Sequence, residues 1–118
     1  MNAEDRAILA RGVALFNDGE YFECHETWEK LWKRSEGEER AALQGLIQAA
    51  VAILHAERGN RRGALSVYRK AIRNLERVPP DCIGIKLTKF RSALNNFFAD
   101  VGTSERRLAR PKLAWCAE

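Results

Sequence analysis

Side chains able to do chemistry are concentrated in one short segment of the chain. It holds one of the two histidines of the sequence and reads Tyr21-Phe22-Glu23-Cys24-His25-Glu26-Thr27-Trp28-Glu29-Lys30-Leu31-Trp32. An imidazole beside several carboxylates can bind a metal ion or transfer protons, and aromatic rings can wall a ligand pocket. The segment therefore marks a candidate site, although its residue types alone do not define a reaction.

Helical spacing places part of this segment on one face. A helix advances about 100° per residue, so four side chains fall within about 60° of arc: Tyr21, His25, Trp28 and Trp32. We expect this face to be turned inward, with His25 in its middle. Glu29 then lies at the edge of the face, Glu26 on its flank, and Glu23 points outward.

A metal site is the first of three interpretations. His25 and Glu29, at i and i+4, could chelate a divalent ion while Glu26 activates water, as in the H-E-x-x-H motif with Glu in place of the second His. That spacing arises by chance in many acidic helices, and the E-x-x-H element of di-iron bundles is missing. We therefore predict no metal and no other cofactor, with His25 and Glu29 as weak metal candidates.

The other two interpretations need no metal. The aromatic and acidic side chains could form a pocket for a small polar or cationic ligand. Alternatively, they could form a buried polar network that fixes the register between helices, since an unpaired buried carboxylate costs several kcal/mol. The sequence contains no Ser-His-Asp set, phosphate loop or dinucleotide fingerprint, so no catalytic residue is predicted. A hydrolase using His25, Glu26 and Glu29 is kept as an alternative to a binding or interaction module.

A second polar stripe offers partners for the first. On the helix predicted over residues 38–58, Gln44, Gln48 and His55 fall within about 40° of one another. Small residues, among them Gly45 and Ala49, line the same helix and allow a neighbour to approach closely. We expect the His25 side of the preceding helix to meet the glutamines. The candidate polar cluster is then Tyr21, Glu23, His25, Glu26, Glu29, Trp32, Gln44, Gln48 and His55.

Five helices are predicted to position these residues. Apolar periodicity, turn signals and breakers place them at about 4–17, 21–33, 38–58, 61–77 and from 81–84 to 101. Gly19 and Gly59 end the first and third helices, Asn60 caps the fourth, and Pro79-Pro80 follows it. No segment alternates with period two. The predicted fold is an all-α, compact antiparallel bundle of helix hairpins in a single domain, residues 1–118, with an extended C-terminal tail over 102–118 that docks back onto the bundle.

Charge is distributed unevenly along the 118 residues, whose net charge is +4. Residues 1–40 carry a net −4 and residues 41–118 a net +8. The fourth predicted helix has a basic face, Arg62, Arg69, Arg73 and Arg77. Binding of nucleic acid or another polyanion is the functional interpretation of this face. A nucleic acid is not expected, because no stacking aromatics are interleaved with these arginines and no helix-turn-helix pattern is present.

Composition restricts the environment and partners. The three cysteines, Cys24, Cys82 and Cys116, are scattered and predict reduced thiols, not a disulfide framework or a zinc site. No apolar run is long enough to span a membrane, and the acidic first residues do not resemble a signal peptide. We therefore expect a cytoplasmic protein. Its partner is expected to be a small polar ligand or another protein, and a homo-oligomer stays open.

The combined pattern resembles a known family, domain of unknown function 309, over roughly residues 9–98. The residues that carry the resemblance are Phe16, Asn17, Gly19, Tyr21, Glu23, His25, Glu26, Glu29 and Trp32, then Gln44–Gln48, His55, Gly59, Asn60, Gly63 and Ala64. The resemblance implies a helical bundle with a shared polar cluster in a small protein of mostly bacterial distribution, and it implies no activity. Cys24 stands where the family usually carries Ala, and we expect it to be a small core residue.

Overall fold

The computed structural model describes residues 1–99, 101 and 109–116, and most of these are helical. The helices are α1 (Ala3–Asn17), α2 (Tyr21–Trp32), α3 (Gly37–Glu57), α4 (Arg61–Glu76) and α5 (Leu87–Ala99), with the short 3-10 helix η1 (Cys82–Gly84) before α5. The all-α prediction and the five helices are confirmed. Tail residues 102–108 and 117–118, and position 100 of the predicted fifth helix, lie outside the described residues.

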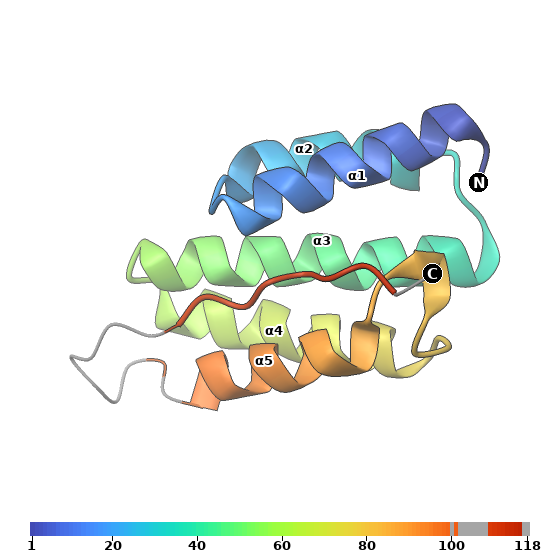
Figure 1. Cartoon of the computed structure of the whole chain (residues 1–118). Coiled ribbons are helices and arrows are strands. Elements are labelled where there is room, and N and C mark those ends of the chain that lie inside the picture. The colour runs from blue at the N-terminus through green and yellow to red at the C-terminus, as the bar shows by residue number, and fades with distance from the viewer. Residues whose placement is uncertain (100, 102–108, 117–118) are drawn as a thin grey trace.

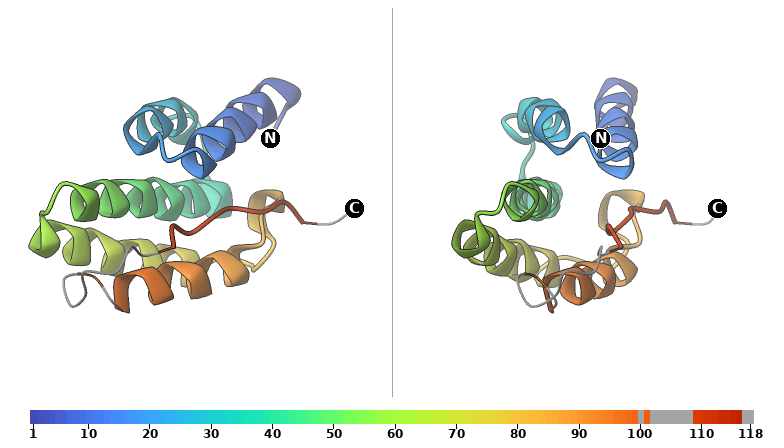
Figure 2. Two further views of the ribbon diagram at one scale, coloured as in Figure 1. Left: turned by 60° about the vertical axis from the view of Figure 1, so that its left-hand side comes forward. Right: turned by 90° about the vertical axis from the view of Figure 1, so that its left-hand side faces the viewer.

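The helices stack in layers with α3 in the middle (Figure 1). The α1–α2 hairpin lies on one side of α3, and α4 and α5 lie on the other (Figure 2). Because α3 is covered from both sides, nine of its residues are buried, from Ala42 to Ile53. This explains why its sequence is apolar over most of its circumference.

Two glycines close the two hairpins in the same way. Gly19 and Gly59 both have φ of +81°, the left-handed conformation that L side chains rarely adopt. In each turn the next residue donates its N–H to the carbonyl five residues earlier, Glu20 to Leu15 and Asn60 to His55, at 2.9 Å. The Asn60 side chain also accepts from the Gly63 N–H, so the predicted cap of α4 is confirmed.

The inner face of α2 is rotated from the predicted one. Its buried residues are Tyr21, Cys24, Trp28 and Leu31, whereas His25 and Trp32 lie on the flanks and are only half-buried. The expectation that His25 occupies the middle of the inward face is therefore wrong. The reason lies in α1, whose Gly12 has no side chain. A Cβ there would lie 1.9 Å from Nε1 of Trp28, so the indole fits only over a glycine.

The rotation satisfies the polar atoms of α2 that are buried against α1. Trp28 Nε1 donates to the Leu9 carbonyl at 3.2 Å, and Cys24 Sγ donates to the Gly12 carbonyl at the same distance. Burial raises the pKa of the Cys24 thiol, which therefore stays protonated. The prediction that Cys24 is a small core residue is confirmed.

The stripe of small residues on α3 has the predicted role of allowing close packing, and at Gly45 the neighbour is α4. A Cβ on Gly45 would lie 2.7 Å from Leu75 Cγ and 3.3 Å from the Ala71 carbonyl. Leu75 and Ala71 are both buried there. In this hairpin too, a glycine on one helix makes room for a large side chain of the other.

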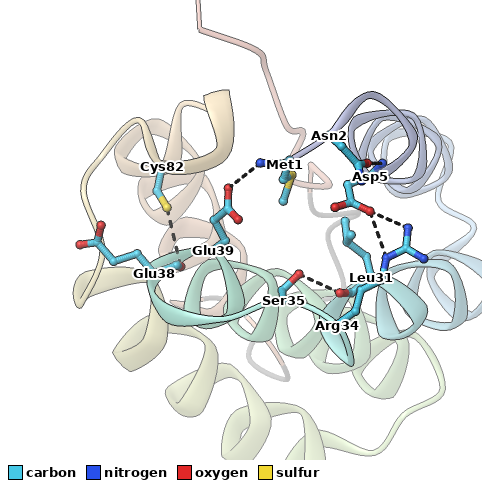
Figure 3. A network of polar contacts seen from close by, with 9 residues as sticks. All are labelled: Met1, Asn2, Asp5, Leu31, Arg34, Ser35, Glu38, Glu39 and Cys82. Atoms are coloured by element: carbon cyan, nitrogen blue, oxygen red, sulfur yellow. Dashed lines mark hydrogen bonds and ion pairs between the residues drawn. The ribbon is translucent and has the colours of Figure 1, made fainter.

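Near the N-terminus, polar contacts connect the first residues of the chain to the start of α3 and to the link after α2 (Figure 3). The Met1 amino group pairs with Glu39 of α3 at 3.3 Å, and Arg34 Nε donates to Asp5 of α1 at 3.0 Å. Ser35, in the link between α2 and α3, donates to the Leu31 carbonyl at 2.7 Å. These contacts fix the start of α3 relative to the first hairpin.

The described part of the tail is extended and packs along the bundle between α1 and α5 (Figures 1 and 2). Pro111 and Leu113 are buried, and residues 85 and 115 form an isolated antiparallel bridge. The predicted docking of the tail is confirmed for residues 109–116. None of the described helices combines the length and apolar character that crossing a membrane requires.

Candidate functional site

A groove of about 250 Å³ opens where the end of α2, the start of α3 and the end of α4 meet. We call it the polar groove, and its lining residues are Trp32, Gly37, Arg40, Ala41, Gln44, Asn74 and Arg77. Two of them, Trp32 and Gln44, belong to the cluster predicted from the sequence. They come from α2 and α3, so the expected meeting of these two helices does occur here.

An aromatic ring and a guanidinium group form one wall of the polar groove. Arg40 Cζ lies 4.0 Å from the centroid of the Trp32 ring, within the range of a cation–π interaction. Trp32 ends α2 and Arg40 belongs to the first turn of α3, so the short link between the helices brings them together. A stacked guanidinium keeps its N–H donors at its edge, where a ligand can reach them.

The lining of the polar groove is positively charged. Arg40 and Arg77 contribute two guanidinium groups, and none of the lining residues is an acid. Among the described residues, no carboxylate forms an ion pair with either arginine. Glu39, in the same turn of α3 as Arg40, is instead paired with the Met1 amino group (Figure 3). The groove is thus suited to an anion.

The start of α3 adds to the positive charge of the groove. The N-cap residue Glu36 makes no side-chain hydrogen bond to the first turn, and Gly37 at that turn lines the groove. The first N–H groups of a helix lack partners within the helix and carry a partial positive charge. This backbone charge has the same sign as the two arginines.

The second predicted glutamine lies one turn beyond the groove and faces α4. Gln48 Oε1 accepts from Asn74 Nδ2 at 2.7 Å, and both side chains are half-buried. Among the described residues, no hydrogen bond joins His25, Glu26 or Glu29 to either glutamine. The expected contact between the His25 side of α2 and the glutamines is therefore wrong, because Gln48 faces α4 and Gln44 meets α2 only at Trp32 in the groove.

The histidine and carboxylates of α2 lie on its outer side. His25 Nε2 pairs with Glu29 Oε1 at 3.2 Å, and the Glu29 side chain is 47% exposed. Glu23 and Glu26 are exposed as well. In the described part of the chain, no group of three His, Cys, Asp or Glu side chains could hold a metal ion. His25 and Glu29 thus form a local surface pair.

The remaining two members of the predicted cluster lie at the opposite end of the bundle. Tyr21 is buried in the core, edge-on to Phe16 with ring centroids 5.1 Å apart. His55 lies in the last turn of α3, where its Nδ1 is 3.2 Å from Nδ2 of the Asn60 side chain. The structure thus divides the predicted cluster among the polar groove, the surface of α2 and the hairpin turns.

The predicted basic face of α4 is exposed along its whole length, at Arg62, Arg69, Arg73 and Arg77. Only Arg77, the last of the four, lines the polar groove. Arg77 therefore adds one positive charge from α4 to the groove that Arg40 also lines.

Two polar residues of the groove, Arg40 and Asn74, were not predicted from the sequence, and neither were the small residues Gly37 and Ala41. Arg40 stands one helical turn before Gln44 and two before Gln48, so extending the glutamine stripe toward the start of the helix finds it. Asn74 gives no comparable signal, because its role depends on the packing of α4 against α3.

Fold and groove together define a small all-helical protein with a polar, positively charged groove between its two hairpins. The chain belongs to the family described as domain of unknown function DUF309, whose model matches residues 9–67. Sequence similarity to this family is therefore located in α1, α2, α3 and the first part of α4. The polar groove is lined partly from this region and partly from the end of α4.

Two uncharacterised proteins are similar to this chain. One, from Aquifex aeolicus (strain VF5), is 27% identical over 104 residues, which are 87% of this chain and 30% of that protein. The other, YpuF of Bacillus subtilis (strain 168), is 41% identical over 58 residues, which are 48% of this chain and 33% of that protein. The matched regions span about a third of the length of these curated relatives.

Proposed function

We propose that the chain is a binding module that takes a small organic anion, carrying a carboxylate or phosphate group, in the polar groove. The observation that carries the proposal is the pair of arginines, Arg40 and Arg77, that flank an open groove without an acid in its lining. Unpaired guanidinium groups at the edge of a groove bind carboxylate or phosphate oxygens through charge-assisted hydrogen bonds.

Further polar groups in the lining favour a specific ligand over loose counter-ion binding. Gln44 and Asn74 line the same groove as the two arginines and offer amide donors and acceptors. Asn74 is held by its hydrogen bond to Gln48, so its amide is oriented before a ligand arrives. A groove with a few oriented polar groups and one aromatic wall is typical of small-molecule sites.

The size and the aromatic wall restrict the class of ligand. A volume of about 250 Å³ is below the usual range of drug-sized pockets, so the ligand is small. Trp32 offers a flat apolar surface beside the Arg40 guanidinium. We therefore expect preference for an anion with a planar group, such as an aromatic carboxylate, over inorganic phosphate.

The proposal is tested by titrating the full chain with benzoate, citrate and inorganic phosphate and following the chemical shifts of the backbone amides. Saturable shifts are expected at Gly37, Arg40 and Arg77. The Arg77→Ala variant should bind about tenfold more weakly, since a hydrogen bond to a charged group contributes about 1.5–3 kcal/mol.

Arg69→Ala is the matched control, because Arg69 lies on the same helix but outside the groove. It should change the affinity by less than about twofold. Equal losses for both variants would contradict a site in the groove and favour diffuse attraction to the basic face of α4. Absence of saturable shifts for all three anions at low salt would refute the proposal.

A further inference from the structure

The described part of the tail packs against the bundle as a bound, extended peptide would. Residues 109–116 run extended between α1 and α5, alongside α3 (Figures 1 and 2). Their backbone makes intersegment hydrogen bonds at two points near η1: Lys86 N–H donates to the Ala114 carbonyl at 2.9 Å, and Cys116 N–H donates to the Gly84 carbonyl at 2.8 Å. The same backbone geometry is used when an extended peptide is added to an exposed edge.

One side chain of α1, that of Asn17, binds the main chain of the tail. Asn17 Oδ1 accepts from the Leu113 N–H at 2.8 Å, and Asn17 Nδ2 donates to the Leu113 carbonyl at 3.0 Å. A primary amide that bonds both the N–H and the C=O of one residue recognises extended backbone whatever its side chain. This contact sets the register of the segment but does not require that the segment belong to the same chain.

Side chains of the tail at Leu113 and before it add specificity to this backbone contact. Leu113 is 5% exposed and Pro111 is also buried. Arg110 Nε donates to Glu57 at the end of α3 at 2.7 Å. Trp115, in contrast, is 45% exposed, so its ring contributes little to the docking. The recognised pattern is thus an arginine and a proline, then a leucine two residues after the proline.

One buried polar group near the Arg110 end of the tail has no partner among the described residues. Tyr21 is 2% exposed, and its hydroxyl has no hydrogen-bond partner among the described residues. Arg110 Cζ lies 5.7 Å from the Tyr21 ring centroid without bonding to that hydroxyl. A buried hydroxyl without a partner is rare and costly. The described tail thus brings the Arg110 guanidinium beside the Tyr21 ring but does not satisfy the hydroxyl.

The residues that receive the tail and the tail itself belong to different parts of the sequence. We call the tail site the set Asn17, Tyr21, Glu57, Gly84 and Lys86. The first three lie within the region that the DUF309 family model matches, residues 9–67, whereas the tail lies beyond it. The region matched by the family model therefore covers the positions of these three residues but not the tail.

We propose that the tail site is a docking site for an extended segment of another protein with an Arg-Pro-x-Leu pattern, and that the chain's own tail is an internal competitor. The partner's main chain bonds to Asn17, its leucine fills the position of Leu113, and its arginine pairs with Glu57. This site lies apart from the polar groove and does not depend on the function proposed for it.

The test uses the full chain and a fluorescent peptide copying residues 109–116, with Cys116→Ser to prevent oxidation. In the Leu113→Asp chain a carboxylate replaces the buried leucine, so the chain's own tail should dock less tightly. Fluorescence anisotropy should then report saturable binding of the peptide. The wild-type chain should bind it at least about tenfold more weakly, because a covalently joined competitor acts at an effective concentration on the order of millimolar.

Matched controls locate the binding. Adding Asn17→Ala to the Leu113→Asp chain should abolish binding, whereas adding Asn96→Ala, an exposed asparagine of α5, should leave it unchanged. A peptide that itself carries Leu113→Asp should not bind. Far-ultraviolet circular dichroism verifies that each variant keeps its helices, and Leu113→Ala replaces Leu113→Asp if that variant does not fold.

Three results would overturn the proposal. The first is failure of the peptide to bind the folded, tail-loosened chain at up to about 1 mM. The second is equal affinity for the wild-type and loosened chains, which would place the peptide elsewhere. The third is a wild-type dimer in light scattering that dissociates on Leu113→Asp, which would identify a second copy's tail as the occupant.

Discussion

The α1–α2 and α3–α4 hairpins share their turn and their close approach but differ in where their polar side chains lie. Both close with a glycine at φ +81°, and both pack a large side chain over a helical glycine, Trp28 over Gly12 and Leu75 over Gly45. In the first hairpin, Trp28 and Cys24 donate to backbone carbonyls of α1. In the second, half-buried amides and exposed guanidinium groups line the polar groove together with Trp32 of α2.

The difference follows from how many hydrogen bonds each side chain offers. An indole has one donor and a thiol one weak donor, so single backbone carbonyls satisfy them inside a packed interface. A primary amide offers two donors and an acceptor, and a guanidinium offers five donors. Two packed helices cannot satisfy so many groups, which therefore lie where solvent or a ligand can reach them. The same hairpin geometry thus gives a closed interface in one case and an open groove in the other.

The largest effect is expected from Gly12→Ala, which breaks the closed interface. The added Cβ would lie 1.9 Å from Trp28 Nε1 and 2.4 Å from two further ring atoms, so the indole must be displaced. Although alanine favours a helix over glycine by about 1 kcal/mol, the free energy of unfolding should fall by about 3 kcal/mol. Urea unfolding followed by circular dichroism measures this. Ala14→Gly, at an exposed position of α1, is the control and should cost only about 1 kcal/mol.

An alkaline effect of intermediate size is expected from the Tyr21 hydroxyl, which α1 does not satisfy. Burial raises the pKa of Tyr21 from 10.0 to about 12, an effect that the Arg110 guanidinium partly offsets. Between these values the unfolded chain has lost the proton while the folded chain keeps it. Stability should therefore fall, by about 2 kcal/mol, as the pH rises from about 10 to about 12.

Tyr21→Phe isolates this contribution. Burial also raises the pKa values of Cys24, Tyr68 and Cys82, so the wild-type curve contains all four groups, and the difference between the two chains reports the contribution of Tyr21. The variant should be at least as stable as the wild type near pH 7, because it removes a buried hydroxyl that has no partner in the described part of the chain. A loss of stability at pH 7, or an unchanged slope above pH 10, would contradict this account.

A smaller loss is expected from Gly45→Ala in the second hairpin. The added Cβ would lie 2.7 Å from Leu75 Cγ, and the leucine side chain can adjust more easily than a packed indole. With the gain in helix propensity included, the free energy of unfolding should fall by about 1 kcal/mol. Thermal unfolding beside Gly12→Ala compares the two interfaces. If the two variants lost equal stability, the contrast between a rigid and an adjustable interface would be wrong.

The smallest effect is expected from His25→Ala on the outer surface of α2. The His25–Glu29 pair joins a half-buried imidazole to an exposed carboxylate at i and i+4, so removing it should change the free energy of unfolding by less than about 0.5 kcal/mol. Glu29→Gln should behave alike, and chemical unfolding of both variants gives the measurement. A loss above about 2 kcal/mol would restore the interpretation of a buried polar network around His25.

Local signals predicted the elements well. Gly19, Gly59 and the Asn60 cap act within a few residues of their own positions, and their effect is visible in the sequence because the chain turns there whatever surrounds it. The bounds of α1 to α4 accordingly lie within one residue of the predicted ones. The fifth helix begins later than predicted, at Leu87, because η1 and the extended Ile85 precede it.

The rotation of α2 could not be predicted in the same way. Two stripes on this helix share Tyr21 and Trp28 and differ only in whether Cys24 and Leu31, or His25 and Trp32, accompany them. Both stripes have helical spacing and aromatic residues, so periodicity does not choose between them. The choice depends on Gly12, which lies on another helix and whose importance appears only when the two helices are packed together.

The sequence by itself thus determined an all-α bundle of hairpins, the turns that close them, a buried Cys24 and a tail that packs back, because these depend on local conformational preference and apolar content. Only the tertiary structure decided which polar side chains meet. It placed Gln48 against Asn74, gathered Trp32, Arg40 and Arg77 around one groove, and left His25 and Glu29 at the surface. The physical reason is that helix rotation is set by contacts between distant residues, whereas the spacing within each helix is fixed by the helix itself.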